Sequence, residues 1–294
     1  MQRANNTLRI IPCADSQEMA ESRWTELNIP RDVAASLGRT AVEAADMGHY
    51  FDSHGNEVDW GQLVERGRSA KKSIAPEDLL PAREVTVHQL TQVQVRNETT
   101  LQAARRLINA GHRPLALNFA NGVEPGGGFL NGARAQEEVL CRSSALYSTL
   151  VDDRMYTHHR ERTLPDSTDW AIYSPDVPVF RTDDGTPLDE PWLLSFITSA
   201  APYAPRIGQP RSAELLRKRI QRVLAIASAY DYETLVLGAW GCGAFGNDPY
   251  STAVDFREAL ENEFKGHFSE VLFAITDWSN ERQYLGPFRE VFST

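Results

Sequence analysis

The sequence is poor in the features that mark secreted and membrane-spanning proteins. Its 294 residues include only three cysteines, and none of them stands in a C-x-x-C pair. This spacing excludes a dense disulfide framework and favours free thiols in a reducing cytosol. No apolar run approaches the length of a membrane span, and residues 1–17 lack the apolar core of a signal peptide. We therefore expect a cytoplasmic protein that does not associate with a membrane.

An excess of basic residues is also missing. The chain has 40 acidic residues against 30 lysines and arginines, which gives a formal net charge of -10. Direct nucleic-acid binding needs a basic surface that releases counterions, so we do not expect it here. An anionic ligand would instead be held locally, by backbone amides and a few arginines. The remaining composition, 41% apolar and 24% charged, is that of a globular protein with a full core.

The chain divides near residue 80, where Pro76 and Pro81 interrupt it. Before this point, Asp15 to Leu37 has helical spacing, and Ser16 is a plausible cap. Residues 49–73 are polar and glycine-rich, which predicts a loop followed by a short helix. We interpret residues 1–80 as a helical extension that packs on a catalytic domain formed by residues 81–294.

Strand-like and helix-like segments alternate from residue 83 onward. The predicted strands are Val85–Val95, Pro114–Phe119, Trp170–Ser174, Val177–Arg181, Trp192–Ala200, Thr234–Gly238 and Val271–Thr276. The predicted helices are Thr99–Ala110, Gln136–Leu150, Ser212–Ala229 and Pro249–Phe264. This alternation predicts an α/β domain with a mainly parallel sheet. In such sheets ligands bind beyond the carboxyl ends of the strands, and two glycine-rich segments fall there.

The first glycine-rich segment is VEPGGGFLNGARAQEE, residues 123–138, which follows the strand-like PLALNF. Glu137 and Glu138 stand together at the start of a predicted helix. Glycosyl chemistry needs a carboxyl that protonates a leaving oxygen and a polar group that fixes the sugar hydroxyls. Adjacent helical residues point about 100° apart, so the two carboxyls suit two different roles. A helix start that simply favours acids through its dipole is the alternative, and the residues alone leave both open.

The second glycine-rich segment is GAWGCGAFGNDPY, residues 238–250, with a G-x-G-x-x-G pattern at Gly241, Gly243 and Gly246. A loop without side chains lets backbone N–H groups approach phosphate oxygens. At Gly243 a side chain would meet those oxygens or oppose a positive φ. No Lys-Ser or Lys-Thr follows, so the segment is not a Walker loop. A structural turn and a Rossmann dinucleotide site are alternatives, but about one strand follows where a Rossmann fold needs several.

Three further groups of residues carry weaker signals. The basic stretch formed by Arg154, His158, His159, Arg160 and Arg162 is either a polyanion patch or a solvated helix end, and we favour the helix end. Cys242 has no His or Asp near it in sequence, so we interpret it as a small residue beside a ligand. The histidines and aspartates of residues 46–54 match no metal-ligand spacing, and we expect no metal site.

The run GGG, seven residues, then QEE resembles the signature of the bacterial-type poly(ADP-ribose) glycohydrolases, which are macrodomain proteins. LNFANGVEPGG and GAWGCGAFGND resemble that family's substrate-ribose and diphosphate loops. The resemblance covers residues 80–294 in the family's order. It implies a macrodomain-like three-layer α/β/α fold with a mixed, mainly parallel sheet. It also implies hydrolysis of the ribose–ribose bonds of poly(ADP-ribose) without a metal or other cofactor.

The resemblance implies a role for particular residues. Glu138 would be the catalytic acid, and Glu137 would bind ribose hydroxyls and orient the scissile bond. The residues implied on the ribose side are Asn121, Gly126, Gly127, Gly128 and Gln136. Those implied around the diphosphate are Gly241, Cys242, Gly243, Ala244, Phe245, Gly246 and Asn247. Glu98 and Thr99 occupy the loop that corresponds to the family's adenine contacts.

Three function classes follow. The first is a poly(ADP-ribose) glycohydrolase that releases ADP-ribose, takes ADP-ribosylated proteins as substrates and takes part in reversing ADP-ribosylation after DNA damage. The second is an ADP-ribose-binding module, or an enzyme that removes single ADP-ribosyl groups. The third is a dinucleotide-dependent oxidoreductase. The acidic couple at residues 137 and 138 favours the first class, because a dehydrogenase has no use for it.

Overall fold

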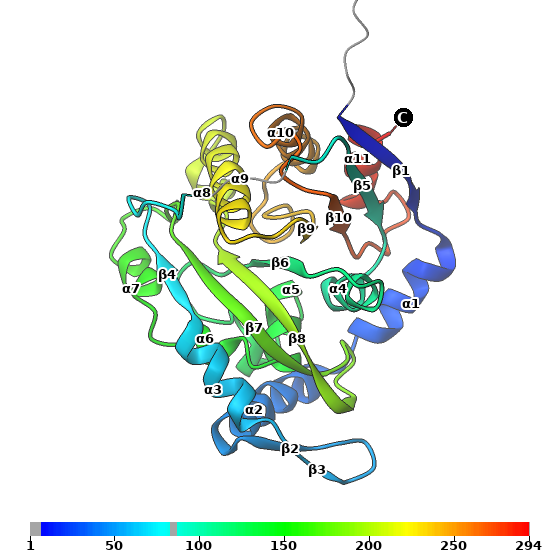
Figure 1. Ribbon diagram of the computed structural model, residues 1–294, viewed down its shortest axis with the longest axis vertical. Helices are drawn as coiled ribbons and strands as arrows, with labels where there is room; N and C mark the ends of the chain where they lie inside the picture. Colours follow the sequence, from blue (N-terminus) through cyan, green and yellow to red (C-terminus); the bar gives the residue numbers. More distant parts are fainter. Residues whose placement is uncertain (1–6, 83–86, 294) are drawn as a thin grey trace, which may run out of the picture. The chain divides into compact units, whose positions relative to one another are not determined.

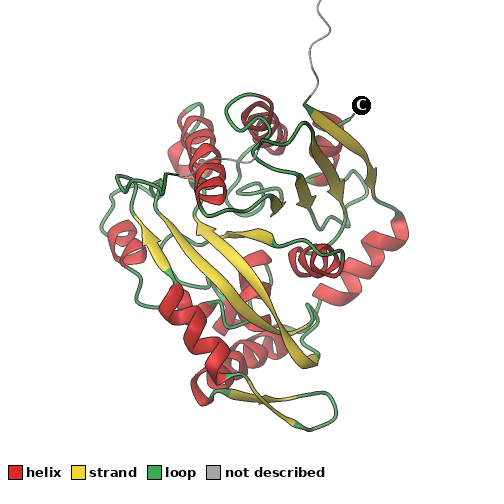
Figure 2. Ribbon diagram, viewed as in Figure 1, coloured by secondary structure: helices red, strands yellow, loops and turns green. Residues whose placement is uncertain are grey.

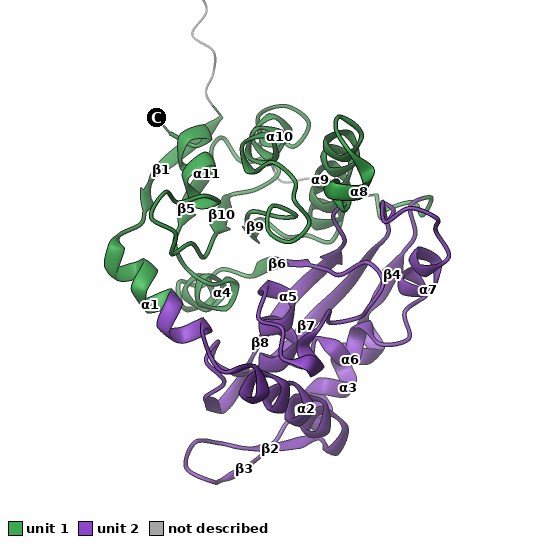
Figure 3. Cartoon of the chain, turned by 180° about the vertical axis from the view of Figure 1, so that it is seen from behind, with its two compact units in different colours: residues 1–23, 77–115, 202–294 green, residues 24–76, 116–201 purple. Residues whose placement is uncertain are grey.

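The computed structural model describes residues 7–82 and 87–293. Contacts within the chain divide it into two compact units (Figure 3). Unit 1 comprises the described residues of the ranges 1–23, 77–115 and 202–294, and unit 2 comprises residues 24–76 and 116–201. Each unit is therefore built from segments that lie far apart in the sequence. Among residues 7–82 and 87–293, no helix is long and apolar enough to cross a membrane.

Unit 1 contains four parallel strands. In sheet order they are β1 (Leu8–Ala14), β5 (Thr91–Arg96), β10 (Glu270–Ala274) and β9 (Thr234–Leu237). The side chains of Val271, Leu272 and Phe273 are fully buried in β10, between its two neighbours. Such a continuous apolar run is typical of a parallel strand that is covered on both faces.

Helices cover these strands. They are α4 (Thr100–Asn109), α8 (Ala204–Ile207), α9 (Arg211–Ala229), α10 (Pro249–Glu261) and α11 (Leu285–Val291), while α1 (Gln17–Leu27) lies where the division falls. Figure 1 shows α10 and α11 above strands β5, β10 and β9, and α4 below them. The strands of unit 1 thus form the middle layer between two layers of helix.

Unit 2 contains a mixed set of strands (Figure 2). In sheet order they are β6 (Pro114–Phe119), β8 (Pro187–Ser199), β7 (Ala171–Arg181) and β4 (Lys72–Ile74), and β2 (His49–Phe51) pairs separately with β3 (Glu57–Asp59). The pairs β7–β8, β4–β7 and β2–β3 are antiparallel. The fold is therefore mixed α/β with a mainly parallel sheet, as the sequence predicted.

The helices of unit 2 include the one that carries the acidic couple. They are α2 (Arg31–Met47), α3 (Gly61–Ala70), η1 (Phe129–Asn131), α5 (Gln136–Ser143), α6 (Tyr147–Leu150) and α7 (Arg154–Arg160). Helix α2 packs against η1 and α5. A Cβ at Gly38 of α2 would lie 2.7 Å from the carbonyl oxygen of Phe129, so only glycine permits this approach. Arg31 Nε also donates to the carbonyl of Asn131, over 2.9 Å.

Several predicted elements have the observed bounds. The strand Pro114–Phe119 is confirmed residue for residue, and the helix predicted over Thr99–Ala110 spans Thr100–Asn109. Thr99 is its N-cap, because its side chain accepts a hydrogen bond from the amide of Gln102. The helix predicted at Ser212 begins one residue earlier. Of the predicted strand Val85–Val95, residues 85 and 86 lie outside the described residues, and the strand itself begins at Thr91.

Other elements differ from the prediction. Residues 7–80 contain the helices α1, α2 and α3 but also β1, β2, β3 and β4, and residues 49–59 form a hairpin rather than a loop. The strand β1 was missed because Pro12 lies inside it, which an edge strand tolerates. The helix predicted over Gln136–Leu150 is two helices, since Ser144 leaves the helix to bridge Val179. The interpretation of residues 1–80 as an extension stays a prediction.

Candidate active site

In unit 2, the two adjacent glutamates occupy the first turn of α5 and are buried, with 3% and 8% of their surface exposed. Glu137 Oε2 accepts a hydrogen bond of 2.7 Å from the backbone amide of Asn121. Its Oε1 accepts a longer one, of 3.3 Å, from Asn118 Nδ2. Both oxygens of Glu137 are thus held by the residues that end β6 and follow it.

Glu138 is held on one side only. Its Oε1 accepts a hydrogen bond of 3.0 Å from the amide of Gly128. Its Oε2 is buried and has no hydrogen-bond partner among the described residues. A buried carboxyl oxygen without a partner is costly, so such atoms point to a function.

The glycines beside the couple are required by its geometry. A Cβ at Gly127 would lie 2.5 Å from Glu138 Oε1 and 3.1 Å from Glu137 Oε2, and the residue also has a φ of +57°. At Gly126, φ is +73° and a Cβ would lie 2.9 Å from the ring of Phe129. At Gly128 it would lie 2.9 Å from Ala133 Cβ. Gly127 therefore lets the loop approach the two carboxyl groups, while Gly126 and Gly128 let it pack against Phe129 and Ala133.

Gln136 and Asn121 shape the same region. Both ends of the Gln136 carboxamide bind the backbone of β6, since Oε1 accepts from the amide of Phe119 and Nε2 donates to the carbonyl of Leu117. Asn121 Oδ1 accepts from the amides of Val123 and Glu124, which closes a tight turn. These bonds fix α5 and the 121–128 loop relative to β6, and the substrate contacts of both residues stay predictions.

The environment of the couple favours retention of a proton. Burial raises the pKa of Glu137 to about 8, the hydrogen bond from Asn121 opposes this, and the nearby charge of Glu138 adds to it. Near neutral pH Glu137 therefore holds a proton that an exposed glutamate would have lost.

In unit 1, the glycine-rich loop follows β9 and runs into α10. Gly241 and Gly246 have φ values of +77° and +65°, and the amide of Asn247 donates to the carbonyl of Gly241. At Gly243, φ is not positive, and a Cβ would meet no atom within 4 Å. The expectation of a positive φ at Gly243 is therefore wrong: Gly241 and Gly246 make the turn instead.

The other loop residues fall into two groups. Gly243 and Ala244 are exposed and Phe245 is half-buried, whereas Cys242 and Asn247 are buried. Asn247 Nδ2 donates to the carbonyls of Pro202 and Gly241, and its Oδ1 accepts from Ser212. Asn247 thus ties the loop to its own unit. Burial raises the pKa of the Cys242 thiol to about 12, which removes it as a nucleophile.

The two residues suggested for adenine also have roles in unit 1. Glu98 is buried and forms ion pairs with Arg96, at 3.1 Å, and with Arg106, at 2.8 Å. Thr99 caps α4. These interactions hold the turn between β5 and α4, and an adenine contact stays a prediction for both residues.

Asn118 was missed by the sequence analysis. It is fully buried at the end of β6, where its Nδ2 also donates to Thr198 Oγ1 of β8. The available signal was a lone amide in the otherwise apolar run PLALNF. Within the described part of the chain, no group of three or more His, Cys, Asp or Glu side chains could hold a metal ion.

A buried carboxyl pair against a glycine loop, on a mixed α/β scaffold, defines the class of this protein as an α/β protein with a glycosidase-type site. Residues 38–182 match the family model of the microbial-type PARG catalytic domain, where PARG stands for poly(ADP-ribose) glycohydrolase. A search of curated proteins gives no match.

Solved structures extend this match over most of the chain. The chain is 38% identical to poly(ADP-ribose) glycohydrolase from Thermomonospora curvata, with a TM-score of 0.83 and coverage of 88% of this chain and 99% of that one. The same enzyme with the inhibitor ADP-HPD gives 39% identity, a TM-score of 0.82 and the same coverage. The enzyme from Deinococcus radiodurans in complex with ADP-ribose gives 39% identity and a TM-score of 0.72, with coverage of 80% of this chain and 98% of that one. The chain belongs to the microbial-type poly(ADP-ribose) glycohydrolase family.

Proposed function

We propose that this chain hydrolyses the ribose–ribose O-glycosidic bonds of poly(ADP-ribose) and releases ADP-ribose, with Glu138 as the general acid and base. The observation that carries the assignment to Glu138 is its Oε2, a buried carboxyl oxygen without a partner among the described residues. Its other oxygen is fixed by the amide of Gly128. A carboxyl held in this way can present one oxygen to a substrate atom.

The hydrogen bonds decide which glutamate has an oxygen available to the substrate. Both oxygens of Glu137 accept hydrogen bonds, from Asn121 and Asn118. Glu138 Oε2 has no such partner among the described residues. We therefore assign the proton transfer to Glu138 and the binding of ribose hydroxyls to Glu137.

The reaction then balances with one carboxyl group. The bond between the anomeric carbon and the 2′-oxygen of the neighbouring ribose breaks, and its electron pair goes to that oxygen, which takes the proton of Glu138. An oxocarbenium ion remains. The Glu138 carboxylate then takes a proton from water while the water oxygen bonds to the anomeric carbon, which restores the acid.

The substrate assignments are part of the same proposal. Relatives bound to ADP-ribose and to ADP-HPD support an ADP-ribose unit as the group recognised here. The exposed backbone of Gly243 and Ala244 would lie along the diphosphate, and Phe245 beside the ribose. Poly(ADP-ribose) on modified proteins would be the natural substrate, in the cytoplasm and in the response to DNA damage.

One incubation tests the activity. The purified chain is mixed with automodified poly(ADP-ribose), with and without EDTA, and the products are separated by chromatography. We expect free ADP-ribose in both samples. A protein that carries single ADP-ribosyl groups is the second substrate. Release from that protein but not from the polymer would make the chain a mono-ADP-ribosyl hydrolase, and binding without release would make it a binding module.

A further inference from the structure

The segment that presents Asn121 is held by unit 2 at consecutive positions. The amide of Ala120 donates to the carbonyl of Ser199, and the amide of Asn121 donates to Glu137. The carbonyls of Gly122 and Val123 are bound by two adjacent side chains of α7. His159 binds the carbonyl of Gly122, and Arg160 binds the carbonyl of Val123. These side chains belong to the basic stretch that the sequence analysis interpreted as a solvated helix end, and that interpretation is wrong for His159, which is buried.

His159 is the buried member of this pair, with 4% of its surface exposed. Its Nδ1 lies 3.0 Å from the carbonyl oxygen of Gly122, and its Nε2 lies 2.7 Å from Thr168 Oγ1 and 3.1 Å from the backbone nitrogen of Thr168. A carbonyl can only accept, a backbone amide can only donate, and a hydroxyl can do either. The contacts are all satisfied by a ring with its hydrogen on Nδ1, which donates to Gly122 and accepts from Thr168.

The space around Gly122 makes this contact sensitive to small changes. A Cβ at Gly122 would lie 2.4 Å from Ser167 Oγ and 3.2 Å from Ala200 Cβ. The backbone of Gly122 is thus confined between β8, the loop after α7 and the His159 ring. The next residue is fixed as well, because Arg160 Nη1 donates to the carbonyl of Val123 over 2.7 Å.

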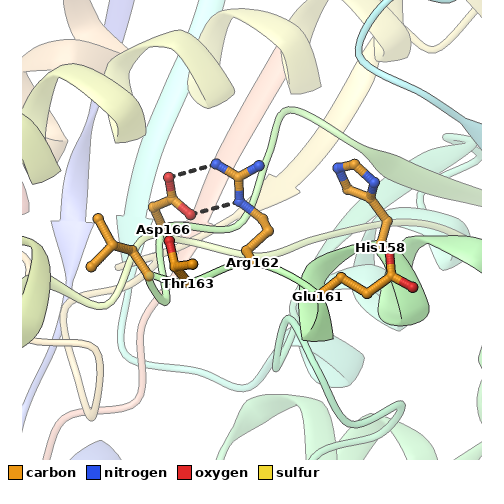
Figure 4. A pocket seen from close by; sticks show the side chains of 6 residues that line it. His158, Glu161, Arg162, Thr163 and Asp166 are labelled. Atoms are coloured by element: carbon orange, nitrogen blue, oxygen red, sulfur yellow. Dashed lines mark hydrogen bonds and ion pairs between the residues drawn. The ribbon is translucent and has the colours of Figure 1, made fainter.

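The loop after α7 is itself fixed by an ion pair. Arg162 Nε and Nη2 each donate to one carboxylate oxygen of Asp166, both over 2.7 Å. Figure 4 shows this two-bond pair beside a pocket of about 380 Å³, with His158 and Glu161 on its other side. Thr168 follows two residues later. The ion pair therefore holds the loop that brings the Thr168 amide to His159.

We propose that His159 is a positioning residue for the reaction: through the Gly122 carbonyl, its Nδ1–H fixes the Asn121 amide that holds Glu137. The inference rests on the proposed function, since it concerns the same carboxyl pair. Asn121 and Glu137 are consecutive links from His159 to the ribose site. A shift of the Gly122 peptide would move the Asn121 amide and release Glu137 Oε2. The orientation of the ribose would change, and the chemical step would slow more than binding.

Three substitutions of His159 separate the effect of its hydrogen bond to the Gly122 carbonyl from that of its hydrogen bond with Thr168. His159→Asn keeps a donor where Nδ1 stands, His159→Gln keeps an acceptor where Nε2 stands, and His159→Leu removes both. We expect kcat on the polymer to fall about 10- to 100-fold in His159→Leu and His159→Gln, and to recover to within about threefold of the native value in His159→Asn. KM should change less than kcat in every variant.

The neighbouring histidine provides the control. His158 is exposed and contacts the ring of Trp170, so His158→Leu should leave kcat within about twofold of the native value. A melting temperature is recorded for every variant. Equal loss of kcat in His159→Asn and His159→Gln would overturn the inference. A histidine that only stabilised the fold would give no reason for the Asn variant to be more active than the Gln variant. Native kcat in His159→Leu would overturn it as well.

Hydrogen exchange gives a readout that needs no turnover. Peptides that cover residues 119–128 should exchange faster in His159→Leu and His159→Gln than in the native chain, and at the native rate in His159→Asn. Equal exchange in all four proteins would contradict the inference. If the native chain failed to cleave the polymer, the proposed function would fail, while this exchange ranking would still decide the role of His159.

Discussion

The two glycine-rich loops use glycine for different reasons. At Gly127 in unit 2, the space that a Cβ would fill is already occupied by the protein's own carboxyl groups, 2.5 Å and 3.1 Å away. At Gly243 in unit 1, the same space is empty to 4 Å, and the backbone has no positive φ. The first loop needs glycine in order to fold around Glu138, whereas no atom of the described residues of unit 1 excludes a side chain at residue 243.

The difference bears on the roles proposed for the two loops. At Gly127 the protein's own carboxyl groups exclude a side chain, so the glycine sets their geometry. At Gly243 no described atom excludes a side chain, and the role proposed for this glycine is to leave its backbone accessible to a diphosphate. That role stays a prediction, which the variants below test.

The largest expected effect comes from the carboxyl group that the first loop surrounds. Glu138→Gln keeps the shape of the side chain but removes the acid, so we expect turnover of the polymer to fall about 10²- to 10⁴-fold. Calorimetry should find ADP-ribose affinity within about tenfold of the native value, because the lost proton transfer matters in the transition state. A variant with near-native turnover would remove Glu138 from the catalytic role.

Gly127→Ala tests whether the two carboxyl groups exclude a side chain at residue 127. The new Cβ would push against Glu138 Oε1, and we expect turnover to fall about 10²-fold through misplacement of the carboxyl. Gly55→Ala is the matched control, because Gly55 also has a positive φ, +81°, but a Cβ there meets nothing within 4 Å. Both variants should lose about 1–2 kcal/mol of stability, and only Gly127→Ala should lose turnover. Equal turnover in the two variants would contradict the steric argument.

A pH series tests the proton held by the couple. The pKa of Glu137 is raised to about 8 from a usual value of 4.5, mainly by burial, so the native state binds a proton that the unfolded chain releases. Stability from this proton is fully present below pH 4.5 and is lost as the pH rises to about 8. Glu137→Gln should show a shallower decline of stability, measured by denaturant unfolding between pH 5 and 8. An identical decline in both proteins would place the proton elsewhere.

Gly243→Val tests the role proposed for the glycine-rich loop of unit 1, and its expected effect is the smallest of the four. We expect ADP-ribose affinity to fall about tenfold, which corresponds to about 1.4 kcal/mol, because the side chain enters the space assigned to the diphosphate. The free energy of unfolding should stay within about 0.5 kcal/mol, since no protein atom lies in the way. Gly246→Ala is the contrast: its φ is +65° and a Cβ would lie 3.2 Å from the Pro205 ring, so it should lower stability. Native affinity in folded Gly243→Val would exclude a diphosphate from this place.

Local signals in the sequence were sufficient for much of the α/β scaffold. The strand Pro114–Phe119 is marked by a short apolar run, and α4 by its helical spacing. These features depend on interactions within a few residues, so they can be read from the chain alone. The resemblance of GGG and QEE to a known signature supplied the family, and the matching structures confirm it.

The tertiary structure decided the contacts between segments that are distant in sequence. Helix α2 reaches the carbonyl of Phe129 through Gly38, Asn118 turns its amide to Glu137, and His159 binds the carbonyl of Gly122. No spacing rule links such residues, because each contact forms only after strands and helices have packed. The sequence by itself determined the carboxyl couple and the glycines beside it. Only the packing of unit 2 determined that one oxygen, Glu138 Oε2, is buried without a partner among the described residues, because that depends on which atoms surround it in space.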